Sequence, residues 1–278
     1  MINRREAVAG AADRLRAAGI DSGSVDSELL LAHCLGLART QLMHVEELEP
    51  SAIAAFDAAV ARRAQREPLQ YIVGDVAFRH VVVPVGPGVF IPRPETELLV
   101  DVVAPALRAV RRPVVVDLCA GSGALALAIA NEYPAATIWA VELSPPALVW
   151  LRGNAAGTGL HVVAGDVRDS RLLSGLAAGV DVVVSNPPYV PTSRQVAPEV
   201  SADPPEAVFA GVDGLALLPS VIARAGELLR PGGTFAVEHD DTHAVQVPEL
   251  LRADGRWTDV ERRRDLSGRS RFALAVRA

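Results

Sequence analysis

Between residues 114 and 238, short valine-rich runs alternate with segments of helical character, and this alternation restricts the possible folds most strongly. Strands are predicted at Val114–Leu118, Thr137–Val141, His161–Ala164, Val180–Ser185 and Thr234–Glu238. Helices are predicted at Ala124–Glu132, Pro145–Ala156 and Leu215–Leu229. Because strands that are joined through helices pair in parallel, we expect an α/β fold whose mostly parallel sheet is covered by helices on both faces.

The end of the chain departs from this alternation. Trp257–Glu261 and Arg271–Val276 read as two strands, and the short link between them contains the turn Asp265–Ser270. This link is too short for a helical crossover, so the two strands are expected to pair antiparallel.

The first 75 residues are expected to form a separate bundle of helices, because apolar residues recur there at helical spacing. Asp26 is the predicted N-cap of the second helix, Gly36 is predicted to help end it, and a third helix is predicted from Ser51 to Arg66. Three regions follow from these patterns: a helical domain at 1–75, a β-hairpin or extended connector at 76–92, and the α/β domain at 93–278.

Composition excludes several classes of protein. The formal charge of −6 gives no general attraction for nucleic acid, and no apolar segment is long enough to suggest a membrane span. Cys34 and Cys119 are far apart and lack metal-ligand spacing, so neither a disulfide framework nor a metal site is expected. The start of the chain carries charges and lacks an apolar signal region, so a cytoplasmic location is predicted.

Asn186, Pro187, Pro188 and Tyr189 follow the apolar run that ends at Ser185. Consecutive prolines cannot continue a central strand, so the chain must leave the sheet at its carboxyl end, where open α/β folds bind ligands. A carboxamide beside an aromatic ring suits a site that holds a planar NH2 group and aims its nitrogen at an electrophile. The alternative is a turn that simply ends a strand.

A turn of small residues follows the first α/β strand. It runs from Asp117 at the end of the strand through Cys119, Ala120, Gly121, Ser122 and Gly123. The glycines allow the backbone to approach a ligand closely, although a plain tight turn would have the same composition.

Acidic residues end the next two strands. Glu142 can accept hydrogen bonds from both hydroxyls of a ribose, or it can be an acid at a helix N-terminus; Asp166 can contact an adenine. No lysine-bearing phosphate loop is present, because all 27 basic residues are arginine. These acids therefore suit a positively charged nucleoside without phosphates, such as S-adenosylmethionine.

Two segments before the α/β region complete a resemblance to a known family. They are Glu67-Pro68-Leu69-Gln70-Tyr71-Ile72-Val73-Gly74 and Phe90-Ile91-Pro92-Arg93-Pro94-Glu95-Thr96-Glu97. With the small-residue turn, the acids and Asn-Pro-Pro-Tyr, the chain resembles class I methyltransferases with a Rossmann-like sheet. Within these it resembles the release factor glutamine N5-methyltransferases, the PrmC/HemK family, over essentially its whole length.

This chain departs from the family's pattern at four positions. The family usually has glycine at Cys119, aspartate at Glu142, an aromatic residue at Val167 and glycine at Asp240. The resemblance implies methyl transfer from S-adenosylmethionine to the side-chain amide of the glutamine in the Gly-Gly-Gln loop of peptide chain release factors, without a metal.

The resemblance also implies roles for individual residues. Asn186, Pro187, Pro188 and Tyr189 would hold the substrate amide, the Asn186 oxygen and the Pro187 carbonyl accepting from its NH2 group. The cofactor would lie against Phe90, Asp117, Cys119, Ala120, Gly121, Ser122, Gly123, Glu142, Asp166, Val167 and Asn186. The helical domain would recognise the protein substrate.

Two other functions are compatible with parts of the sequence. Adenine N6-methyltransferases share Asn-Pro-Pro-Tyr, but they should carry a basic recognition region. The first 75 residues instead contain eight Arg against eleven Asp or Glu, a net charge of −3. A non-catalytic adapter could use the helical bundle alone, but the intact turn and Asn-Pro-Pro-Tyr motif argue against this.

Overall fold

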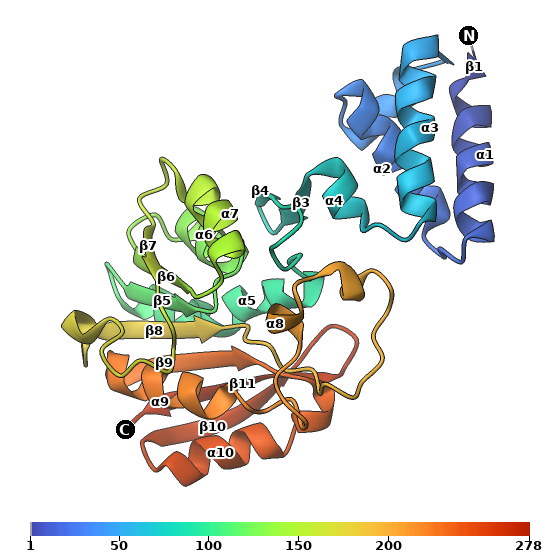
Figure 1. The fold of residues 1–278 in the computed structure, drawn as a ribbon. Helices are drawn as coiled ribbons and strands as arrows, with labels where there is room; N and C mark the ends of the chain where they lie inside the picture. The colour runs from blue at the N-terminus through green and yellow to red at the C-terminus, as the bar shows by residue number, and fades with distance from the viewer. Residues whose placement is uncertain (1) are drawn as a thin grey trace. The chain divides into compact units, whose positions relative to one another are not determined.

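The computed structural model describes residues 2–278, which form two compact units (Figure 1). The first unit contains the chain up to Asp75 together with residues 196–202, and the second contains 76–195 and 203–278. The chain therefore enters the first unit a second time, shortly after the Asn-Pro-Pro-Tyr motif. The sequence of residues 196–202 gave no indication that this segment packs with the N-terminal helices.

The first unit is built mainly from helices that pack around an apolar core. Leu15, Leu30 and Phe56 are buried in this core, each at 2% exposure or less. Its elements are β1 (Ile2–Asn3), α1 (Arg4–Ala17), α2 (Gly23–Leu35), η1 (Arg39–His44), β2 (Glu47–Leu48), α3 (Pro50–Ala64), α4 (Leu69–Val73) and η4 (Val200–Ala202).

The predicted N-cap of α2 was wrong, whereas the predicted end of this helix is confirmed. The helix begins at Gly23, so Asp26 lies in its first turn, where it is 4% exposed. Its carboxylate accepts a hydrogen bond from Arg63 Nε at 2.8 Å, and Arg63 also binds Glu199 of the returning segment at 2.9 Å. Gly36 ends the helix in the left-handed conformation, at a φ of 64°.

The second unit contains a seven-stranded sheet in the order β10-β11-β9-β8-β5-β6-β7. Its strands are β5 (Val114–Leu118), β6 (Thr137–Glu142), β7 (His161–Ala164), β8 (Val180–Ser185), β9 (Leu229–Glu238), β10 (Trp257–Arg264) and β11 (Ser270–Arg277). The pairs from β7 to β9 are parallel, and β11 is antiparallel to both of its neighbours. The mostly parallel sheet and the antiparallel strands at the end of the chain are confirmed.

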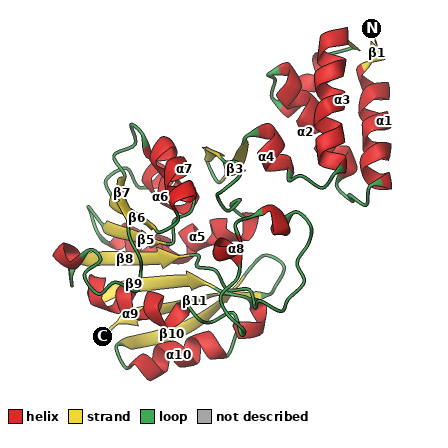
Figure 2. Cartoon of the chain, viewed as in Figure 1, coloured by secondary structure: helices red, strands yellow, loops and turns green. Residues whose placement is uncertain are grey.

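Helices cover both faces of this sheet (Figure 2). Both α5 (Leu98–Ala109) and α9 (Leu218–Leu228) contact β8 and β9. Residues of α9 share an apolar cluster with Val183 and Phe235, and no residue of α5 belongs to this cluster, so the two helices lie on opposite faces. The remaining helical elements are η2 (Pro94–Glu97), α6 (Ala124–Glu132), α7 (Pro145–Ala155), η3 (Ser174–Leu176), α8 (Pro205–Val208), η5 (Asp241–His243) and α10 (Gln246–Asp254). Among residues 2–278, no helix combines the length and apolar character needed to cross a membrane.

A short hairpin precedes the sheet, where the sequence predicted a hairpin or extended connector. It consists of β3 (Asp75–Phe78) and β4 (Val81–Pro84). The segment that continues from it to η2 contains Phe90 and Pro92, and these two residues line the cavity described below.

Candidate functional site

A cavity of about 520 Å³ lies at the carboxyl ends of the parallel strands. Strand β5 pairs with β6 on one side and with β8 on the other, so the strand order reverses at β5. Such a switch point is where open α/β sheets form ligand sites, because the loops leaving the adjacent strands diverge there. The cavity has the size of a small-molecule site.

The small-residue turn after β5 lies against this cavity. Gly121 has a φ of 57°, and a Cβ built on it would meet no atom within 4 Å. Gly123 has a φ of 86°, and its Cβ would lie 2.6 Å from Leu151 Cδ1, so a side chain there would be strained and would displace the Leu151 side chain of α7. Cys119 also has a positive φ, 64°, a conformation that glycine adopts more readily than cysteine.

Asp117 points a carboxylate oxygen into this region without a partner. Its side chain is 1% exposed, and Oδ2 has no hydrogen bond among the described residues. Burial, reinforced by the charge of Glu142, raises the pKa of Asp117 to about 8, although the Ala126 N–H opposes the shift. A buried carboxyl group with an unpartnered oxygen favours a cationic or hydrogen-bond-donating ligand.

Asp117→Asn is expected to change how stability depends on pH. The folded pKa of about 8 lies above the ordinary value of 3.8, so the stabilising contribution of Asp117 is lost as pH rises toward 8. Asparagine has no charge to bury. In thermal melts without ligand, the melting temperature of the variant should therefore rise relative to that of the natural protein between about pH 4 and pH 8. If the difference in melting temperature between the two proteins stayed constant across this pH range, Asp117 would not have a raised pKa.

Glu142, at the end of β6, organises the turn that lies beside it. Its Oε2 accepts from the Gly121 N–H at 2.8 Å, while Oε1 accepts from the N–H groups of Leu143 and Ser144 at 2.8 and 2.7 Å. Glu142 lines the cavity and precedes α7, so its position is compatible both with a ribose acceptor and with an acid at a helix N-terminus. With four lone-pair sites and three donors, the carboxylate keeps capacity for one further hydrogen bond.

Asp166, after β7, lines the cavity but is already engaged. Its carboxylate accepts hydrogen bonds from Nε and Nη2 of Arg168, the latter at 2.7 Å, and from the Arg168 backbone N–H. These contacts with Arg168 lower the pKa of Asp166. The neighbouring Val167 is 6% exposed and also lines the cavity, as an aliphatic wall in place of an aromatic one.

The Asn-Pro-Pro-Tyr motif leaves β8 at the edge of the cavity. Asn186 and Pro188 line it, whereas Pro187 is buried. The Asn186 amide nitrogen donates to Thr96 Oγ1 at 3.0 Å, and the Tyr189 hydroxyl donates to Glu238 at 2.8 Å.

The structure brings together most of the residues that the sequence predicted for the cofactor. The cavity is lined by Phe90, Asp117, Cys119, Ala120, Gly121, Ser122, Glu142, Asp166, Val167 and Asn186; Gly123 is not among its lining residues. The roles of these residues in binding stay predictions.

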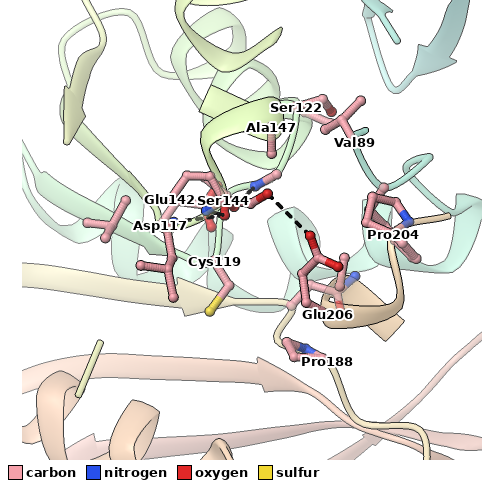
Figure 3. A pocket seen from close by; sticks show the side chains of 18 of the residues that line it. Val89, Asp117, Cys119, Ser122, Glu142, Ser144, Ala147, Pro188, Pro204 and Glu206 are labelled. Carbon is pink, nitrogen blue, oxygen red and sulfur yellow. Dashed lines mark hydrogen bonds between the residues drawn. The ribbon is translucent and has the colours of Figure 1, made fainter. Parts of the chain in front are cut away.

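Other lining residues were not predicted. Thr96 lies in the segment that carried the family resemblance, and this resemblance is the sequence signal for its position. Glu206 and Pro204 follow the returning segment 196–202, and no sequence pattern pointed to them. Glu206 faces Ser144 across the cavity, with a hydrogen bond of 3.4 Å (Figure 3).

Asp240, a departure from the family pattern, caps a short helix. Its backbone has a φ of −64°, so no glycine is needed. Its Oδ1 accepts from the N–H and hydroxyl of Thr242 at 3.0 and 2.6 Å, and its Oδ2 pairs with Arg194 at 2.6 Å. The aspartate therefore begins η5 and holds part of the loop that follows Tyr189.

A sheet of this order, with its cavity at the switch point beside β5 and β8, places the protein among the class I methyltransferases. Residues 6–74 match the PrmC N-terminal domain, and residues 87–203 match the methyltransferase small domain. The whole chain is 50% identical to the release factor glutamine methyltransferase of Mycolicibacterium smegmatis, covering 99% of that protein. The chain belongs to the release factor glutamine methyltransferase family.

Two further similarities were found. The release factor glutamine methyltransferase of Streptomyces coelicolor is 45% identical over 98% of this chain and 97% of its own length. The crystal structure of a methyltransferase from Pyrococcus furiosus is 16% identical, with a TM-score of 0.49, and the match covers 70% of this chain and 87% of that one. The family relationship follows from the sequence relatives, which match over nearly their full lengths.

Proposed function

We propose that the protein transfers a methyl group from S-adenosylmethionine to the side-chain amide nitrogen of the glutamine in the Gly-Gly-Gln motif of peptide chain release factors, in the cytoplasm. The observation that carries the proposal is the Asn186 carboxamide at the edge of the cavity. Thr96 binds its NH2 group, which leaves its oxygen to accept from the NH2 group of a substrate. The names of the full-length relatives support the same substrate.

The residues around the cavity fit S-adenosylmethionine, which supplies an electrophilic methyl group on a sulfonium centre. The unpartnered Asp117 oxygen would hold the ammonium of the methionine part. Glu142 has acceptor capacity for a ribose hydroxyl, and the turn at Gly121 leaves room for close approach. Val167 offers an apolar surface for the adenine.

The protein's task in this reaction is to orient a poor nucleophile. The lone pair of an amide nitrogen is delocalised into its carbonyl group. The Asn186 oxygen and the Pro187 carbonyl would accept hydrogen bonds from the substrate NH2, which orients the nitrogen and places negative potential where positive charge develops. We assign Tyr189 to packing on the amide plane. Most of the rate enhancement should come from alignment of the nitrogen with the methyl group.

The test is a transfer assay with radiolabelled S-adenosylmethionine. Purified release factor, the same factor with alanine in place of the motif glutamine, and adenine-containing DNA are offered separately. Label should enter only the unaltered release factor. Label in DNA would favour an adenine methyltransferase, and label in neither substrate would reject the proposed activity.

Glu142→Ala is expected to weaken cofactor binding, because both a ribose acceptor and the partner of the Gly121 N–H are lost. Charge-assisted hydrogen bonds contribute roughly 1.5–3 kcal/mol each, so one lost bond should raise the dissociation constant by about 10–100-fold. Calorimetry with S-adenosylmethionine measures this, with Asp169→Ala as a control on an exposed acid outside the cavity. Equal affinities in the two variants would place the ribose elsewhere.

We also propose that the helical unit recognises the release factor, because one glutamine side chain offers too little surface for selection. The test uses a shortened protein that begins at Val76. It also carries Glu199→Gln, because Glu199 otherwise pairs with Arg63 and Arg66 of the missing helices. This protein should still bind S-adenosylmethionine. It should methylate a short Gly-Gly-Gln peptide about as fast as the full chain does, yet methylate intact release factor at least about 10-fold more slowly. After circular dichroism has verified folding, full activity on intact release factor would reject the recognition role.

A further inference from the structure

A chain of hydrogen bonds leads from Asn186 to a buried carboxylate. Asn186 Nδ2 donates to Thr96 Oγ1 at 3.0 Å, Thr96 Oγ1 donates to Glu238 Oε2 at 2.7 Å, and Tyr189 Oη donates to Glu238 Oε1 at 2.8 Å. Glu238 has no exposed surface, and Thr96 is 5% exposed. We call these four residues the Glu238 network.

The fold holds the Glu238 network in place. Strands β8 and β9 are parallel neighbours in which Ser185 is paired with Val237. Asn186 and Glu238 are therefore the next residues along two adjacent strands. Thr96 comes from η2, immediately before α5, and α5 packs on these same two strands. The network thus joins the carboxyl ends of β8 and β9 to η2, which leads into a helix packed on both strands.

The carboxylate gives the chain of hydrogen bonds a direction. An ionised carboxylate can only accept, so the single hydroxyl proton of Thr96 is committed to Glu238. The Thr96 oxygen can then only accept, and Asn186 must turn its NH2 group toward it. The Asn186 oxygen lies on the other side of the carboxamide and is left for a different donor.

The surroundings of Glu238 determine when it is ionised. Burial and the charge of Glu95 raise its pKa to about 7, against the opposing effects of its hydrogen bonds from Thr96 and Tyr189 and of the charge of Arg271. Burial and the charge of Glu238 raise the pKa of Tyr189, so this hydroxyl keeps the proton that it donates. At about pH 8 the carboxylate therefore accepts from both hydroxyls.

We propose that Glu238, acting through Thr96, is a positioning residue that holds the Asn186 carboxamide with its oxygen toward the substrate glutamine. A carboxamide turned the other way would present NH2 to the NH2 of the substrate, and two donors would face each other. The inference rests on the proposed function, because it takes the substrate to be an amide that donates to Asn186.

The test compares Thr96→Val, which has nearly the same shape but no hydroxyl, with Thr96→Ser, which keeps the hydroxyl. At about pH 8, kcat for release factor should fall about 10–100-fold in Thr96→Val, while KM and the affinity for S-adenosylmethionine change less than about threefold. Thr96→Ser should stay within about threefold of the natural protein in all three quantities. An unchanged kcat in Thr96→Val would overturn the proposal.

A spectroscopic measurement on the same proteins separates this proposal from the proposed function. The side-chain NH2 resonances of Asn186, assigned by their loss in Asn186→Ala, should shift in Thr96→Val and stay in place in Thr96→Ser. Resonances that coincide in Thr96→Val and the natural protein would overturn the positioning role, whatever the activity. A natural protein that methylates no release factor would reject the proposed function, while the resonances would still report on the carboxamide.

Discussion

Asn186→Ala should slow methyl transfer to release factor by about 10²–10³-fold, the loss typical when one preorganised hydrogen-bonding group is removed from a reacting centre. The residue follows β8 directly, and its carboxamide is held by Thr96 at the edge of the cavity. Alanine removes the acceptor for the substrate NH2 but leaves the strand and the turn after β5 unchanged. The fold and most of the cofactor affinity should therefore remain.

Transfer of radiolabel to intact release factor measures the rate of methyl transfer, and calorimetry with S-adenosylmethionine measures the cofactor affinity. Asn131→Ala is a matched control, because Asn131 is an exposed asparagine on α6. It should transfer label at the natural rate. If Asn186→Ala matched this control in turnover, the carboxamide would have no part in the reaction.

Arg63→Ala is expected to destabilise the helical unit by about 3–5 kcal/mol, because it leaves a buried charge without its partner. The Arg63 side chain is 7% exposed and Asp26 is 6% exposed, so water cannot replace the lost pair. Arg62→Ala is the matched control on the same helix. The Arg62 side chain is 50% exposed and pairs with Glu67, so its loss should cost about 0–1 kcal/mol.

Urea unfolding, followed by tryptophan fluorescence and by circular dichroism, measures the difference in stability between Arg63→Ala and Arg62→Ala. The three tryptophans, Trp139, Trp150 and Trp257, all lie in the second unit, so their fluorescence follows that unit. Circular dichroism follows the helices of both units. The dichroism midpoint should fall much further in Arg63→Ala than in Arg62→Ala. Equal midpoints in the two variants would show that the buried pair adds nothing to stability.

The sheet and the turn beside the cavity were predictable because their signals are local. The valine-rich run before Leu118 is a buried strand, and the glycines after it adopt the positive φ values that their position requires. Helix α5 was missed; Pro105 within it is a residue that normally argues against a helix interior. The N-cap assigned to Asp26 failed because a local rule gave no sign of an ion pair with a residue 37 positions away.

The parts of the site that depend on distant partners could not be predicted. Thr96 and Glu238 are separated by 142 positions, and neither residue stands in a pattern that indicates the other. Glu142 was recognised as an acceptor at a strand end, but its bond to the Gly121 N–H depends on how the two loops converge. The types of residue in the site were thus predictable, whereas their hydrogen-bond partners required the fold.

The return of residues 196–202 to the helical unit has a consequence for the order in which the chain can fold during synthesis. Arg63 leaves the ribosome 136 residues before Glu199, so α1, α2 and α3 can pack early but lack this carboxylate until most of the sheet strands have been made. Completion of the helical unit is therefore coupled to synthesis of β8 and of the motif that follows it. A nascent chain arrested before residue 196 would carry a helical unit with one of its buried arginine contacts still unmade.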